Sequence, residues 1–132
     1  MKPLLSLAVL LVTSTLAMAD APTSKVTPLV TQDFTTIPGK QGLMLLIEFP
    51  PGGSDPIHHH NSEVFVYVLE GSIVMQVKGG KEVTLGRGDV FTEKPTDVHV
   101  VGRNASATEP AKFVVFMVLD KGAPPVIPGD RP

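Results

Sequence analysis

The feature that most constrains the fold is a series of short β-rich segments separated by turns that contain glycine or proline. The segments are rich in β-branched and aromatic residues, which favour strands. They cover residues 26–30, 42–49, 63–69, 72–77, 81–85, 90–93, 98–101 and 112–119. No stretch has a convincing helical period. About eight short strands with closely spaced turns indicate one small all-β domain, an antiparallel barrel or sandwich.

The first nineteen residues read as an export signal. Lys2 supplies a positive charge, residues 4–16 form an uncharged apolar run, and Ala17-Met18-Ala19 has the small residues of a cleavage site. A membrane anchor is the alternative, but the run is shorter than the roughly twenty residues that a span needs. We therefore expect residues 1–19 to be a cleaved secretory signal peptide and the protein to be exported, periplasmic or secreted.

The remaining chain divides into three parts. Residues 20–41 are expected to form an N-terminal leader and an edge strand, residues 42–120 a β-barrel, and residues 121–132 a Pro/Gly-rich C-terminal tail. A small barrel leaves sheet edges and apolar outer faces that need cover. A homodimer is expected for this reason, and the N-terminal strand and the tail are the segments suspected of crossing to the partner.

Composition excludes several classes of function. The chain has no cysteine, so disulfides are ruled out and any metal site must use nitrogen and oxygen ligands. The formal net charge is −2, which is unlike the basic surface of a nucleic-acid-binding protein. Beyond the signal, no segment is apolar and long enough to cross a membrane.

All four histidines lie in two short segments. His58, His59 and His60 precede the strongest strand signal, and His99 follows Pro95-Thr96-Asp97-Val98. Residues two apart on a strand share a face, so His58 and His60 can grip one cation while His59 points away. If His99 meets this pair in space, the three imidazoles form a metal site on a β scaffold.

These residues resemble the two motifs of the cupin superfamily. The first motif runs here from Gly52 or Gly53 through His58, His60 and Glu63 to Gly71, and the second runs from Gly88 through Pro95 and His99 to Asn104. More narrowly, the chain resembles small, single-domain exported cupins. The resemblance implies an antiparallel jelly-roll barrel and a metal held by His58, His60, His99 and Glu63.

Glu63 departs from the family pattern, because it comes one place before the usual carboxylate position, which Val64 occupies. In an unbroken strand Glu63 faces away from His58 and His60. A bulge at Asn61-Ser62 would bring it back to the metal side. We expect either that bulge, or a regular strand that turns Val64, Val66 and Val68 inward.

Other polar and aromatic residues have less specific expectations. Glu93 is expected to be a solvated charge at a strand end, and His59 to be exposed or to support the site through a hydrogen bond. The larger apolar side chains are expected in the core; they are Phe65, Tyr67, Met75, Phe91, Phe113 and Phe116.

Three imidazoles, with or without a carboxylate, suit a divalent transition metal: copper, zinc, iron, manganese or nickel. Open coordination positions can accept water, dioxygen or a chelating substrate. The resemblance implies a metal-binding cupin that acts on a small molecule by oxygenase, isomerase or decarboxylase-like chemistry, with Glu63, Glu93 or a water on the metal to move protons. The alternatives are a non-catalytic periplasmic module that binds a metal or small ligand, and a purely structural metal.

Overall fold

A computed structural model of the protein describes residues 20–132, and the expected signal peptide lies outside them. The described residues form eleven strands and no helix. Consequently they include no helix with the length and apolar character needed to cross a membrane.

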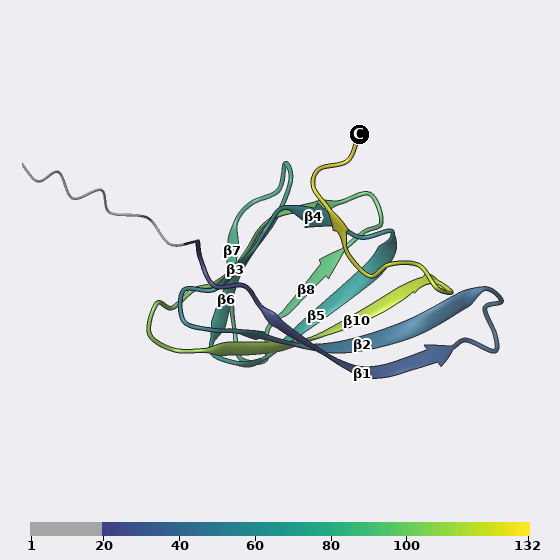
Figure 1. Ribbon diagram of the computed structural model, residues 1–132, viewed down its shortest axis with the longest axis horizontal. Coiled ribbons are helices and arrows are strands. Elements are labelled where there is room, and N and C mark those ends of the chain that lie inside the picture. Colours follow the sequence, from purple (N-terminus) through teal and green to yellow (C-terminus); the bar gives the residue numbers. More distant parts are fainter. Residues whose placement is uncertain (1–19) are drawn as a thin grey trace, which may run out of the picture.

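The strands form two antiparallel sheets that face each other in a jelly roll (Figure 1). In spatial order, the first sheet contains β1 (Lys25–Asp33), β2 (Lys40–Phe49), β10 (Ala111–Asp120), β5 (Ser62–Glu70) and β8 (Val90–Glu93). The second contains β11 (Ile127–Pro128), β4 (His58–His59), β9 (Val98–Asn104), β6 (Ser72–Val77) and β7 (Val83–Gly86), with β3 (Ser54–Asp55) paired to β9. Hydrogen bonds do not close the two sheets into one continuous barrel.

Strands β2, β5 and β10 of the first sheet build most of the core, and buried residues alternate with outward-facing ones along most of their length. On β5, Val64, Val66 and Val68 are buried while the residues between them are exposed. Their partners on β10 include Met117 opposite Val64 and Val115 opposite Val66. Each buried aliphatic side chain contributes about 1.5–3 kcal/mol of transfer free energy, so a one-residue slip of register would be costly.

Gly71 lets the chain leave β5 and enter β6 in the opposite sheet. Its φ of 70° lies in the left-handed region, and a Cβ there would come within 2.5 Å of the Pro110 carbonyl oxygen. The turn expected at Glu70-Gly71 therefore needs glycine for two independent reasons. The return after Gly79-Gly80 is looser than the expected two-residue hairpin, because β7 begins only at Val83.

Two aromatic side chains on β5 were expected in the core but lie outside it. Phe65 and Tyr67 alternate with the buried valines and are about half exposed on the outer face, whereas Phe113 and Met75 are buried. The strand period explains the difference, because only every second residue of β5 can face the interior.

The C-terminal segment is more than an extended tail. Residues 121–132, which we call the C-terminal strap, return from β10 toward β4, where β11 pairs Ile127 with His59 and Pro128 with His58 (Figure 1). The Arg131 guanidinium donates hydrogen bonds to the carbonyl oxygens of His60 and Pro95. The strap is thus attached to the segment that carries three of the four histidines.

Candidate metal centre

The site lies between the two sheets, with residues from β4 and β9 of the second sheet and from β8 of the first. His58 on β4 is the direct cross-strand partner of His99 on β9. Directly opposed residues on neighbouring strands project side by side. His60 lies two residues beyond His58 and faces the same cavity.

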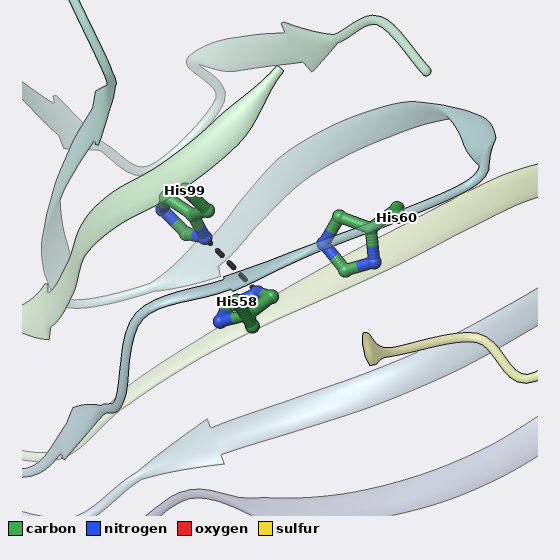
Figure 2. Close-up of side chains that lie close together, drawn as sticks. All are labelled: His58, His60 and His99. Atoms are coloured by element: carbon green, nitrogen blue, oxygen red, sulfur yellow. Dashed lines mark hydrogen bonds between the residues drawn. The ribbon is translucent and has the colours of Figure 1, made fainter. Parts of the chain in front are cut away.

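The three histidines form a compact, buried cluster (Figure 2). One ring nitrogen from each of His58, His60 and His99 lies within 4.8 Å of the other two. The Nδ1 atom of His99 lies 3.3 Å from Nε2 of His58, and each ring is less than a tenth exposed. These residues fit a divalent transition metal, because each buried side chain brings one nitrogen close to the other two.

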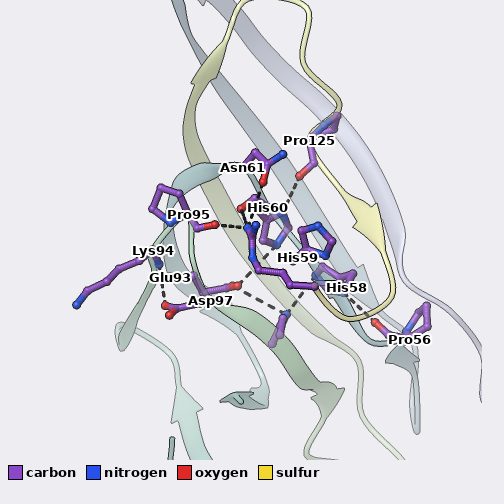
Figure 3. Close-up of polar contacts among 12 residues, drawn as sticks. Pro56, His58, His59, His60, Asn61, Glu93, Lys94, Pro95, Asp97 and Pro125 are labelled. Atoms are coloured by element: carbon purple, nitrogen blue, oxygen red, sulfur yellow. Dashed lines mark hydrogen bonds and ion pairs between the residues drawn. The ribbon is translucent and has the colours of Figure 1, made fainter. Parts of the chain in front are cut away.

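Backbone carbonyls fix the orientation of two of these rings (Figure 3). The Nδ1–H of His58 donates to the carbonyl oxygen of Pro56 at 2.8 Å, and the Nδ1–H of His60 donates to that of Pro125 at 2.6 Å. With Nδ1 protonated, the neutral ring presents the Nε2 lone pair to the cluster. Pro125 belongs to the strap, so the far end of the chain helps to orient His60.

His59 faces the other way from its neighbours, as the strand geometry predicts. It is buried, with an exposed fraction of 7%. Its Nδ1–H donates to the carbonyl oxygen of Gly129 at 3.1 Å. The side chain therefore holds the strap rather than joining the cluster.

Glu93 contradicts the expectation of a solvated charge. It is the last residue of β8, its exposed fraction is 3%, and it lines the same cavity as the histidines. Its Oε2 lies 3.7 Å from Nε2 of His60, and its Oε1 lies 3.9 Å from Nδ1 of His99. Glu93 is buried because it pairs directly with the inward-facing Val64. Directly paired residues on neighbouring strands point to the same face of the sheet.

Glu63 lies outside the cluster. The pairing of β5 with β10 runs without interruption from Ser62 to Val68, so there is no bulge at Asn61-Ser62 to turn the carboxylate inward. Glu63 is exposed on the outer face, and Val64 faces the cavity. The structure thus brings together His58, His60 and His99 but leaves Glu63 apart from them.

Burial shifts the pKa values of His60, His99 and Glu93. Desolvation lowers the pKa of His60 to about 4, only partly offset by its bond to the Pro125 carbonyl. Desolvation, followed by repulsion from His58 and His60, lowers the pKa of His99 to about 3. Both rings are consequently neutral at pH 7 and have a lone pair for a metal. Burial, with a smaller contribution from Asp97, raises the pKa of Glu93 to about 7.

The cluster opens onto an apolar cavity of about 480 Å³. Apolar side chains line most of it, from β1, β2, β5, β6 and β10, and the strap contributes Pro125, Val126 and Pro128. No lysine or arginine of the described residues lines its wall. A cavity of this size, with a few convergent polar groups, is typical of small-molecule sites.

Comparison with known proteins identifies the family. The cupin domain model matches residues 45–117, more than half of the chain. The protein therefore belongs to the cupin family, as its two histidine motifs indicated. No curated protein matches the sequence.

Solved structures share the fold at low sequence identity. A conserved protein with a double-stranded β-helix domain from Klebsiella pneumoniae is 18% identical with a TM-score of 0.63, over 80% of this chain and 85% of that one. A cupin domain from Bordetella pertussis is 22% identical with a TM-score of 0.60, over 76% and 98%.

A third similar structure has a named activity. The DMSP lyase DddQ from Ruegeria pomeroyi is 23% identical with a TM-score of 0.58, over 65% of this chain but only 42% of its own. At this level of identity the likeness describes the fold alone.

Sequence reasoning missed the burial of Glu93 and the position of the strap. The signal for Glu93 was its spacing from His99: Glu93 ends one strand and His99 lies in the next, across a short turn. No local signal places the strap, because its side-chain hydrogen bonds with His59 and His60 join residues 65 to 71 positions apart.

Proposed function

We propose that the protein is a metal-dependent cupin that acts on a small molecule, with the metal held by His58, His60 and His99. The observation that carries this proposal is the convergence of three buried imidazoles at one end of a largely apolar cavity. Such a metal, when bound, supplies Lewis-acid or redox chemistry of the oxygenase, isomerase or decarboxylase-like type. Export to the periplasm or out of the cell is part of the proposal, from the signal-like first nineteen residues.

The side chains that line the cavity indicate which class of substrate it can bind. Aliphatic side chains such as Leu45, Val66 and Met117 line the cavity. They favour contact with the apolar part of a substrate over contact with water. Since no lysine or arginine of the described chain lines the wall, a carboxylate or phosphate would find no cationic side chain there. A small, mainly apolar molecule with one metal-binding polar group fits these properties.

The first test is the metal content of the protein, purified without added metal from its native compartment. We expect near-stoichiometric transition metal in the wild type and little in His99→Ala. The variant should remain folded, as followed by cooperative thermal unfolding, because the apolar core of β2, β5 and β10 does not depend on His99.

The same pair of proteins separates the competing functions. A metal that is lost together with several kcal/mol of stability would indicate a purely structural site. Metal-free wild type that also fails to take up Zn²⁺ or Cu²⁺ would overturn the proposal and favour a metal-independent binding module. Metal binding with no turnover of any apolar chelating substrate would favour a metal-dependent binding module.

A further inference from the structure

Glu93 faces a group with which it makes no ordinary hydrogen bond. Nε2 of His60 is 3.7 Å from Oε2 of Glu93, beyond hydrogen-bond length. His60 already uses its Nδ1–H on the Pro125 carbonyl, so the neutral ring has no proton left on Nε2. When Glu93 is ionised, a lone pair and a carboxylate oxygen therefore face each other inside the protein.

Glu93 also lacks any other partner that would account for its burial. Among residues 20–132, no hydrogen-bond donor contacts its Oε2. No lysine or arginine side chain of the described residues forms an ion pair with it. A buried, ionised carboxylate without a donor or a counter-charge is costly. Either a proton on Glu93 or a cation between the carboxylate and the imidazoles removes that cost.

The position of Glu93 in the sheet matches the missing family carboxylate. The family pattern places that carboxylate where Val64 stands on β5. Val64 and Glu93 are direct cross-strand partners on β5 and β8. Side chains of directly opposed residues lie on the same face with Cβ atoms about 4.5–5.5 Å apart. A carboxylate moved from one strand to the next at this position would reach the same region of the cavity.

We propose that Glu93, delivered from β8, is the fourth protein ligand of the metal and takes the place that Val64 leaves without a donor. This inference rests on the proposed metal site of His58, His60 and His99 and adds an oxygen ligand to it. Glu63, despite its place in the first motif, plays no part in metal binding.

The test measures Cu²⁺ affinity by competition with a chromophoric chelator, together with the EPR spectrum of the Cu²⁺-loaded protein. Glu93→Gln keeps the shape of the side chain but removes its charge. We expect Cu²⁺ affinity to fall by about 100-fold, the upper end of the range for loss of a group that only supports a ligand, and the EPR parameters to change. Glu63→Gln is the matched control and should leave both unchanged.

A rescue experiment tests whether the carboxylate on β8 replaces the family carboxylate on β5. In the double variant Val64→Glu/Glu93→Val, the carboxylate moves to the family position while the volume on β8 is filled by an aliphatic side chain. We expect this variant to bind Cu²⁺ more tightly than Glu93→Gln. A folded double variant that binds no better would contradict the exchange; if the double variant does not fold, Glu93→Gln decides.

The outcomes distinguish the two levels of the proposal. Wild type that binds no Cu²⁺ would overturn both the metal site and the role of Glu93. Wild type that binds Cu²⁺ while Glu93→Gln keeps its affinity and EPR spectrum would leave the three-histidine site intact and exclude Glu93 as a ligand. In that case the carboxylate would be free to carry protons instead.

Discussion

At the scale of single residues, the position of each imidazole ring depends on what lies behind it. Carbonyl oxygens hold His58 and His60 from the back, whereas the ring of His99 packs against the backbone of β9 at Gly102. An ideal Cβ on Gly102 would lie 2.8 Å from Cε1 and 3.2 Å from Nε2 of His99. The absence of a side chain at residue 102 therefore leaves room for the His99 ring beside His58.

Gly102→Ala is expected to weaken metal binding without unfolding the protein. The added methyl group must push the His99 ring, since the ring is the nearest obstacle and can rotate. Displacing a ligand in this way should lower Zn²⁺ affinity by about 10- to 100-fold, as for loss of a group that orients a ligand. Gly86→Ala, whose Cβ would meet only Asp89 Oδ2 at 3.8 Å, is the matched control. Equal Zn²⁺ affinities for the two variants would contradict this account.

At the scale of elements, the strap joins the end of the chain to the metal centre. It supplies the Pro125 carbonyl that orients His60, pairs through β11 with β4, and lines part of the cavity. The exposed Lys78 also forms a 2.5 Å ion pair with Asp130. Because these contacts join the strap to the histidine segment, its loss should affect the site more than the core.

A chain that ends at Ala123 should test this role of the strap. We expect cooperative unfolding to persist, since Ala123 is the only strap residue that packs against the main core cluster among residues 20–132. Zn²⁺ affinity should fall by about 10- to 100-fold, because His60 loses the acceptor of its Nδ1–H. Lys78→Ala removes only the outer ion pair and should have a much smaller effect. Truncated protein with wild-type Zn²⁺ affinity would show that the strap only covers the cavity.

At the scale of the whole molecule, the buried site couples stability to pH. Folding lowers the pKa of His60 to about 4 and that of His99 to about 3, from 6.5 in the unfolded chain. As pH falls below 6.5, the unfolded state takes up these two protons before the folded state does. Glu93 acts in the opposite sense, because folding raises its pKa from 4.5 to about 7. As pH falls from 6.5 to 4.5, His60 and His99 therefore lower the stability of the folded state, and Glu93 raises it.

We therefore expect the metal-free protein to lose stability as pH falls from 6.5 to 4.5. The urea midpoint of chelator-treated protein, measured at several pH values, gives this dependence. Glu93→Gln should make the loss steeper, since it removes the opposing group. A midpoint that rises as the solution is acidified would mean that the histidines are not neutral when buried.

The outer surface leads to our proposal of a homodimer. The nine-residue strand β1 is an edge of its sheet, and Leu29 and Val30 on it are about half exposed. An exposed, apolar edge strand is a ready surface for a second copy of the chain. We expect micromolar wild-type protein to sediment as a dimer and Leu29→Asp as a monomer. Val90→Asp, on the β8 edge, is the control and should stay dimeric; a monomeric wild type would refute the proposal.

The local pattern of the sequence predicted an all-β barrel or sandwich, and the resemblance to the cupin motifs predicted the jelly roll and three candidate ligands. Alternation and turn chemistry act over a few residues, so the strands and the shared face of His58 and His60 could be predicted directly, and the motif spacing placed His99 with them. The tertiary structure decided which carboxylate lies with the histidines and what holds their rings. Cross-strand register placed Glu93 opposite Val64, and long-range packing brought Pro125 to His60. Both depend on contacts between distant segments, which no local periodicity encodes.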